Sequence, residues 1–546
     1  MADVEETEMK RSLTLTGVTV NAMALIAPGA FLWTTFQVQA AQSAGGKSTA
    51  GEMWTGLLFA LVLAFLTAYS YSELARIYPD AGAGSSYYFA EAALLDKEKE
   101  QHRKLARFMK LTVGWISHLY YWIYPGIMVA FGGILVSYIY TTITNNTLGY
   151  PVLALVALAF ALLCGYIAYR GVSGSTTAAI MVNVIQITTL VAFGIVAILF
   201  RLNHPHLGTY MQPNAAHIVV PHNLMFVIYQ STIAILLLVG FESVTALGAE
   251  ALRPEKDIRR GILLSLLIQG GICYLFEYFA SNFAISDVTN AASGSGSSAI
   301  AGGYPSAGAS GAPIADMLKV FGDRMLGHTG TTLALIMAVT VLLALIGTTL
   351  ACLNTGVRIT YVMGRDKEMP GVLGLLHGKY ATPHGGIWIL TGLSALLGIY
   401  GVHNVDNLTQ ITLASNTGTF LVYGLSCLIA IIAFASRHDR HVFKHFFVPG
   451  LGLLMNISEL LGIIYLSIKA GGSTQTDTVK ALAIVVLWIV LGLIWVLGNP
   501  RMRGTKLFHE PPPSEGKRAI PKPAEPLGEP LVPEVPAEGP EVTAEA

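Results

Sequence analysis

The sequence predicts an all-α integral membrane protein with twelve transmembrane helices. Of its 546 residues, 53% are hydrophobic and only 12% are charged, whereas soluble globular proteins average about 25% charged residues. Twelve apolar segments are each long enough to cross the roughly 30 Å hydrocarbon layer of a bilayer. They lie near residues 16–40, 54–76, 110–140, 151–169, 176–200, 224–248, 261–284, 331–357, 386–402, 408–435, 447–468 and 480–498.

The distribution of basic residues supports this count and predicts that both termini are cytoplasmic. If the N-terminus lies inside, 27 of the 33 lysines and arginines fall on cytoplasmic segments, as the positive-inside rule requires. The formal net charge is zero, so the chain has no overall basic field that would attract nucleic acid. We therefore expect a multi-pass protein of the cell membrane, in contact with the lipid bilayer and without a nucleic-acid partner.

Three parts of the chain differ in composition. Residues 1–14 form a short polar tail, and residues 15–498 form the twelve-helix core. Residues 499–546 are rich in proline and acidic side chains and hold almost no aromatic residues, a composition typical of disordered segments. The four cysteines lie singly in apolar runs and are expected to be small buried side chains.

The first span is interrupted near its centre by Ala27-Pro28-Gly29. Proline removes a backbone donor and clashes with the preceding helical turn, while glycine tolerates the conformations that an unwound segment needs. Taken alone, the interruption could be a proline kink in a packed helix. The alternative is a break that divides the span into two half-helices.

The sixth span contains a similar interruption at Val239-Gly240-Phe241, directly followed by Glu242. Glycine costs a helix interior about 1 kcal/mol relative to alanine. Inserting a charged residue such as glutamate at mid-membrane depth costs roughly 2.5 to 3.5 kcal/mol on insertion scales. Two unfavourable choices side by side indicate function rather than packing. Interrupted spans at corresponding positions of two halves point to the binding site of a transporter, where freed amides bind an anionic group and freed carbonyls bind a cation.

Other polar residues inside spans are weaker candidates for the same site. Tyr124 precedes Pro125-Gly126 in an aromatic-rich third span, Asn354 lies in the eighth span, and Ser415-Asn416 lie in the tenth. Between the seventh and eighth spans, a segment rich in glycine, serine and alanine is expected to be a flexible loop that forms a short helix near residues 314–321. We find no metal-ligand set, nucleophile elbow or phosphate-binding loop at a convincing spacing, so we expect no enzyme activity, cofactor or metal site.

Three stretches together resemble the amino acid-polyamine-organocation (APC) superfamily of secondary transporters. The end of the second span carries Glu73, Pro79, Gly82, Gly84 and Tyr87-Tyr88 in the family's order. The sixth span and the turn after it carry Gly240-Phe241-Glu242-Ser243, Glu250, Pro254 and Arg259-Arg260. The end of the eighth span carries Arg358, Tyr361, Arg365-Asp366 and Pro370. The resemblance implies a leucine-transporter-like fold, in which spans one to five and six to ten are inverted repeats and two further helices follow.

The chain departs from the family at two positions. Many members have the first-span signature G-[SA]-G-[IV]-F, whereas this chain has Ala27-Pro28-Gly29-Ala30-Phe31 and so lacks one amide that could bind a carboxylate. Some proton-coupled relatives carry a lysine in span five, where this chain has no lysine and has Gln186 or Thr188 near that position. Glu242 is therefore the expected proton carrier, since burial favours the neutral form of a carboxyl group.

The resemblance and the two interruptions lead to one functional hypothesis. We expect a secondary transporter of amino acids or related amines that works by alternating access, coupled to protons or acting as an exchanger, with Na⁺ not excluded. The expected substrate-binding residues are Ile26, Ala27, Pro28, Gly29, Ala30, Val239, Gly240, Phe241, Tyr124, Asn354, Ser415 and Asn416. Backbone amides around Pro28 to Phe31 would hold the substrate carboxylate, carbonyls of residues 23–26 and 238–240 would hold its ammonium, and Phe241 would act as a gate.

Several alternatives stay open from the sequence. The same scaffold could serve a non-transporting sensor or a channel-like protein that uses the proline-rich tail as its output. Glu242 could hold a cationic substrate instead of a proton, which would point to polyamines or basic amino acids. The oligomeric state cannot be read from the residues.

Overall fold

The computed structural model describes residues 13–26, 30–79, 85–95, 100–171, 176–205, 215–248, 251–285, 302–366, 368–378, 380 and 382–498. The predicted interruption Ala27-Pro28-Gly29, most of the N-terminal tail and the whole tail 499–546 lie outside the described residues. The side chain of Ala30 also lies outside them.

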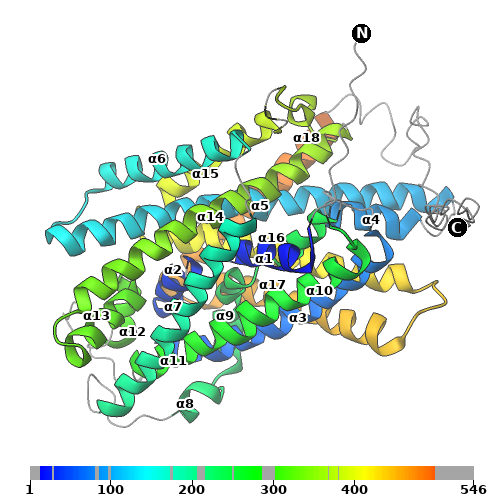
Figure 1. Ribbon diagram of the computed structural model, residues 1–546. Coiled ribbons are helices and arrows are strands. Elements are labelled where there is room, and N and C mark those ends of the chain that lie inside the picture. The colour runs from blue at the N-terminus through cyan, green and yellow to red at the C-terminus, as the bar shows by residue number, and fades with distance from the viewer. Residues whose placement is uncertain are drawn as a thin grey trace, which may run out of the picture.

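The described chain is almost entirely helical (Figure 1). The first half holds α1 (Leu15–Ile26), α2 (Ala30–Ala40), α3 (Met53–Ile77), α4 (Ser86–Leu95), α5 (Glu100–Thr144), α6 (Tyr150–Tyr169), α7 (Thr176–Asn203) and α8 (Ala216–Val219). A two-stranded ribbon of β1 (Ser43–Ala44) and β2 (Lys47–Ser48) and a 3₁₀ turn, η1 (Ala50–Glu52), connect α2 to α3.

The second half begins with α9 (Leu224–Ala234) and two 3₁₀ segments, η3 (Ile235–Leu237) and η4 (Phe241–Leu247). It continues with α10 (Pro254–Leu266), the π-helical η5 (Leu267–Tyr274), α11 (Leu275–Ile285), α12 (Gly303–Ala309), α13 (Pro313–Met325), α14 (Gly330–Arg365) and η6 (Gly371–Gly374). The last elements are α15 (His384–Gly401), α16 (Val405–Phe434), η7 (Phe443–Phe447), α17 (Val448–Lys469) and α18 (Gly472–Gly498). The predicted short helix near 314–321 corresponds to α13.

Eleven helical stretches among the described residues are long and apolar enough to cross a membrane. The twelfth predicted span is the first one, which consists of two shorter helices, α1 and α2, on either side of the undescribed residues 27–29. The chain is thus the all-α membrane protein that the sequence predicts. The third span is longer than expected, because α5 continues well beyond both predicted ends.

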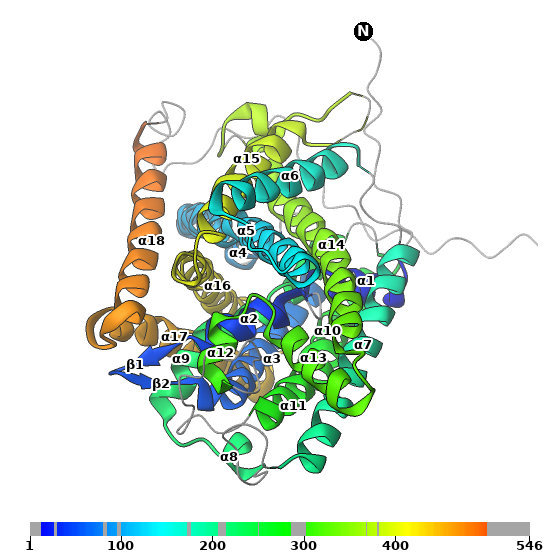
Figure 2. The same ribbon diagram turned by 90° about the vertical axis from the view of Figure 1, so that its left-hand side faces the viewer.

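The two divided spans lie against each other in the middle of the molecule (Figure 2). Helix α1 packs on η4, and α2 packs on α9 and η3. The backbone N–H of Leu252 also donates to the carbonyl of Leu13 at 2.9 Å, which joins the start of the first span to the end of the sixth. The long helix α5 packs against α14, α15 and α16 beside them, while α18 stands at one side of the bundle in Figure 2.

One end of the bundle is held by a cluster of ion pairs around Glu73 of α3, whose side chain is buried. Its carboxylate lies 2.7 Å from Arg259 of α10, 2.8 Å from Arg76 and 3.4 Å from His445 of η7. Arg76 also contacts Asp439 at 3.3 Å. The cluster connects α3, α10 and the segment before α17, and it gives a buried carboxylate two cationic partners.

Candidate functional site

The sixth span changes its helical type where the sequence predicts a break. The α-helix ends at Ala234, a 3₁₀ turn covers Ile235–Leu237, and a second 3₁₀ segment starts at Phe241. Between them Gly240 has φ +126° and ψ −18°, a backbone conformation that residues with a Cβ rarely adopt. A Cβ placed there would come within 2.9 Å of Leu25 of α1. Glycine is therefore required both by the turn and by the close approach of the first span.

Glu242 is buried beside this break and is surrounded by hydrogen-bond donors. Its Oε1 accepts from the hydroxyls of Tyr120 at 2.8 Å and Tyr121 at 3.2 Å, both on α5. Its Oε2 accepts from the hydroxyl of Tyr423 on α16 at 2.8 Å and from the backbone N–H of Gly240 at 3.0 Å. Three elements that are far apart in the sequence thus meet at one carboxyl group.

Four donors match the full accepting capacity of an ionised carboxylate, which offers about four lone-pair sites. This arrangement fits the charged form, because hydrogen bonds to a carboxylate offset the loss of its hydration. It also leaves no lone pair of Glu242 free for the ammonium of a substrate in this conformation. Adding a proton would convert one accepting oxygen into a donor, so at least one of the four bonds would have to break.

The aromatic ring of Phe241 closes the space next to this carboxyl group. It is fully buried and packs against Tyr71 of α3 at 6.1 Å and Tyr423 at 5.2 Å between ring centroids. Val239 and Leu238 are buried as well. Among the described residues, these buried side chains line the sixth-span side of the region between the two divided spans.

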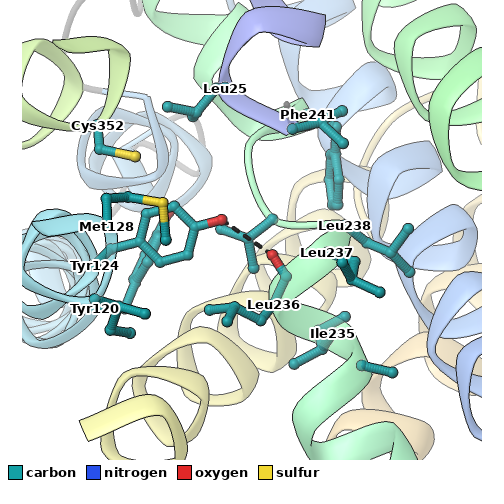
Figure 3. Packing of buried hydrophobic residues seen from close by; sticks show 14 of the residues in the cluster. Leu25, Tyr120, Tyr124, Met128, Ile235, Leu236, Leu237, Leu238, Phe241 and Cys352 are labelled. Carbon is teal, nitrogen blue, oxygen red and sulfur yellow. Dashed lines mark hydrogen bonds between the residues drawn. The ribbon is translucent and has the colours of Figure 1, made fainter. Parts of the chain in front are cut away.

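Several carbonyls at the ends of the half-helices already accept hydrogen bonds from side chains. Gln269 of η5 donates to Met23 at 2.9 Å, Tyr274 donates to Ile26 at 2.5 Å, and Tyr124 donates to Leu236 at 3.0 Å, as Figure 3 shows for the last pair. The carbonyls of Met23 and Ile26 belong to the predicted ammonium site. In this conformation their acceptor capacity is partly used by the protein itself.

The remaining predicted residues lie on helices around the break. Asn416 of α16 donates from Nδ2 to the carbonyl of Thr232 at 2.7 Å, which links α16 to α9. Its Oδ1 and the hydroxyl of Ser415 are buried and have no partner among the described residues. These two groups can therefore still form hydrogen bonds with a ligand or water. Asn354 is half-buried on α14. The amides expected to bind a carboxylate lie around residues 28–31. Pro28 and Gly29 lie outside the described residues, while the backbone of Ala30 and Phe31 forms the start of α2.

A cavity of about 420 Å³ lies elsewhere, between α5, α6, α12 and α13. It is lined by Tyr138, Ser310 and Asp316 among others. Tyr138 and Ser310 both donate to Asp316, at 3.1 and 2.6 Å. This cavity is separate from the paired breaks, and it includes none of the residues that the sequence singles out.

Comparison with known proteins is decisive for the family. The sequence model described as amino acid permease matches residues 12–494 of the chain. The chain belongs to the amino acid permease family. This confirms the resemblance to the APC superfamily and makes the permease a transporter rather than an enzyme.

Named relatives align with the permease over most of their length. It is 24% identical over 519 residues to the low-affinity putrescine importer PlaP of Escherichia coli, covering 93% of this chain and 96% of that protein. It is 23% identical to the branched-chain amino acid permease BcaP of Bacillus subtilis, covering 90% and 93%. It is 25% identical over 422 residues to a methylthioribose transporter of Bacillus subtilis, covering 72% and 78%.

Sequence reasoning did not identify the partners of the permease's buried groups. Tyr120 and Tyr121 stood out only as members of an aromatic-rich helix, and Tyr423 not at all. Gln269 and Tyr274 were also missed, although a glutamine within an apolar span and the Gly270-Gly271 pair after it could have drawn attention to this segment. These residues make their contacts because α5, η5 and α16 pack against α1 and the sixth span.

Proposed function

We propose that the permease carries amino acids or related amines across the membrane by alternating access, with the substrate bound between the two divided spans. The observation that carries this proposal is the close approach of Leu25, near the end of α1, to Gly240 in the break of the sixth span, beside the buried Glu242 that α5 also contacts. The relatives named as importers of putrescine and permeases of branched-chain amino acids support this substrate class.

The substrate groups have natural partners at the ends of the half-helices. The N-terminus of α2 at Ala30 would attract the carboxylate, because the first amides of a helix have no intrahelical acceptor and carry partial positive charge. The ammonium would donate to the carbonyls of Met23 and Ile26 after Gln269 and Tyr274 have turned away. At these two carbonyls the ammonium would replace Gln269 and Tyr274 as the hydrogen-bond donor. Because both side chains belong to η5, substrate binding would be coupled to the position of η5.

Proton coupling would act through Glu242. A proton on this carboxyl group removes at least one bond from Tyr120, Tyr121, Tyr423 or the Gly240 amide. Loss of the Gly240 bond would free the turn that carries Phe241, and loss of the tyrosine bonds would loosen α5 and α16 from the sixth span. Protonation and opening of the gate would thereby be linked.

Both termini are proposed to lie in the cytoplasm of a cell whose plasma membrane holds the permease. The support is the asymmetric distribution of lysine and arginine along the chain. Single cysteines introduced at exposed Glu255 and at exposed Leu326, which the prediction places on opposite sides, can be labelled with an impermeant maleimide in intact cells. Only the Leu326 position should react from outside, and the reverse pattern would contradict the orientation.

The function can be tested with the purified permease in liposomes. Uptake of labelled branched-chain amino acids and of putrescine is measured with and without an inward proton gradient. We expect saturable uptake of at least one of these substrates, with competition by its close analogues. Absence of uptake and of counterflow for every amino acid and amine tested would contradict the proposed substrate class.

A further inference from the structure

A second buried carboxyl group, that of Glu277, lies in α11 within the span Pro254–Ile285. Its side chain is 0% exposed. At a rise of 1.5 Å per residue it is about 12 Å from the Ile285 end of the helix, which places it within the hydrocarbon layer. Neither of its oxygens has a hydrogen-bond partner among the residues that the structure describes.

No charged side chain of the described residues acts on Glu277. The titratable and charged groups on its own helix and on the elements packed around it are engaged with other partners or are neutral. On its own span, Cys273 lies one turn before Glu277, Tyr278 donates to Gln39, and Tyr274 of η5 donates to the carbonyl of Ile26. On α7, Arg201 donates to the carbonyls of Phe283 and Ala284. On the other neighbouring elements, Asp316 of α13 accepts from Tyr138, Glu52 at the start of α3 accepts from His222, and His217 of α8 lies beside the ring of His222.

An ionised carboxylate in these surroundings would be very unfavourable. The effective cost of burying one unpaired ion is several kcal/mol, and the cost is offset only by a counter-charge or by donors. Glu73 is equally buried but faces Arg259 and Arg76. Glu459 of α17 accepts from Ser231. Glu277 differs from both because the residues that the structure describes supply neither a donor nor a cation to it.

Helix α11 and the helix α2 that contacts it hold further buried polar groups. Ser281 lies four residues further on the same helix face, and its hydroxyl also lacks a partner among the described residues. Helix α2 contacts α11 through Phe36 and Tyr278, whose ring centroids are 5.6 Å apart. Trp33 and Thr35 of α2 likewise bury polar atoms without partners in the described chain. Both helices thus hold buried polar groups for which the described residues supply no partner.

We propose that Glu277 is a proton-binding site of the permease, separate from Glu242, which holds a proton in this closed conformation. The proton exchanges with the solution when α2 and α11 separate and water reaches the polar groups between them. The proposal adds a second protonatable position on the half of the seventh span nearer Ile285, and it does not depend on which substrate is carried.

The decisive experiment is infrared spectroscopy of the purified permease, because it reports protonation directly and requires no transport. The spectrum of the Glu277→Gln variant at neutral pH is subtracted from that of the unchanged protein. We expect the difference to contain the C=O stretching band of one protonated carboxylic acid. A carboxylate band in its place would overturn the proposal, whether a bound cation or an amine were the reason.

A labelling experiment on the unchanged protein guards against misfolding of the variant. Dicyclohexylcarbodiimide, a lipophilic reagent, modifies protonated carboxyl groups in apolar surroundings, and mass spectrometry locates the modified residue. Glu277 should be modified, and the equally buried but ion-paired Glu73 serves as the matched control. Modification of Glu73 without modification of Glu277 would count against the proposal.

Uptake in liposomes shows whether the proton at Glu277 takes part in transport. Glutamine reproduces the size and the neutrality of the protonated side chain, so Glu277→Gln should fold. Its uptake should depend less on external pH, because one exchangeable proton has been removed. An unaltered pH profile would show that Glu277 does not exchange its proton during transport.

Discussion

Glu242 and Glu277 are two carboxyl groups with nearly the same burial, 1% and 0% exposed, and opposite surroundings. Glu242 accepts four hydrogen bonds, whereas Glu277 accepts none from the described residues. The difference shows that depth in the membrane alone does not determine the protonation state of a carboxyl group. The donors around it decide whether the protein stabilises the charged form or requires a proton.

The backbone explains part of this difference. Glu242 follows a helix break, where the amide of Gly240 has no helical acceptor and can bind the carboxylate two residues later. Glu277 lies inside the continuous helix α11, where backbone amides are already bonded to carbonyls of the preceding turn. A broken span can therefore solvate its own acid, and an intact one cannot.

Replacing Glu242 by glutamine should have the largest effect on transport. If the glutamine amide nitrogen replaces Oε2, it cannot accept from the Tyr423 hydroxyl or the Gly240 amide, and these two donors then face a third donor. A hydrogen bond to a charged group is worth about 1.5 to 3 kcal/mol. Uptake driven by a proton gradient should fall at least about tenfold. Glu255→Gln, at an exposed position of α10, is the matched control. Unchanged proton-driven uptake in Glu242→Gln would contradict the proton role.

Gly240→Ala should have the second largest effect, since it removes the turn that lets the break reach Glu242. At φ +126° an alanine is strained, and its Cβ would lie 2.9 to 3.0 Å from atoms of Leu25. Uptake should fall several-fold and the melting temperature should drop. Gly347→Ala on α14 is the control, because a Cβ there meets no atom within 4 Å and alanine favours a helix by about 1 kcal/mol. Full activity of Gly240→Ala would show that the turn tolerates a side chain.

The sequence predicted the spans and the break at Gly240, because apolar length and glycine leave a direct signal in a chain that crosses a membrane. The interruption at Ala27-Pro28-Gly29 stays a prediction. The sequence also selected Glu242, since an acid next to a helix breaker is unusual at that depth. It could not predict that three tyrosines surround this acid. Tyr120 and Tyr423 are about 300 residues apart, and their meeting depends on how α5 and α16 pack against the sixth span.

Glu277 was overlooked for a related reason. A single acid within an apolar span gives the same sequence signal whether it is hydrogen-bonded, as Glu459 is to Ser231, or has no partner among the described residues, as Glu277 does. Only the positions of neighbouring helices distinguish the two cases. The sequence therefore singled out only Glu242, whose helix break is visible in the residues, and the packing of the helices distinguishes the other buried acids.

Tyr423→Phe should lower uptake by a smaller amount than either change above, because three donors to Glu242 remain. The sharper readout is a double-mutant cycle with Glu242→Gln. If Tyr423 acts through the carboxylate, the double variant should be no worse than Glu242→Gln alone. Tyr465→Phe, at a 45% exposed position of α17, should leave uptake unchanged. Fully additive losses would indicate that Tyr423 acts independently of Glu242.

Glu368, just beyond the end of α14, lies between the two extremes. Its side chain is 6% exposed, and it shares the single hydroxyl proton of Tyr87 with Asp366, at 2.6 and 2.9 Å. Lys110 bonds to Asp366 at 2.8 Å and partly opposes the effect of burial. Burial nevertheless raises the pKa of Glu368 to about 7. One hydroxyl proton cannot serve two carboxylates, so the geometry also favours a proton on one of the acids.

The smallest effect on transport is expected for Glu368→Gln, which should instead change the response of stability to pH. Because the pKa of Glu368 rises from 4.5 to about 7 on folding, the folded chain retains a proton that the unfolded chain releases between these values. The free energy of unfolding should therefore fall as pH rises from 4.5 to 7, by about 3 kcal/mol for this group. Thermal unfolding in detergent at several pH values should show a weaker decline in Glu368→Gln than in the unchanged protein. Equal declines in both would mean that Glu368 is already ionised in the folded chain, as Glu242 is expected to be, and not protonated, as proposed for Glu277.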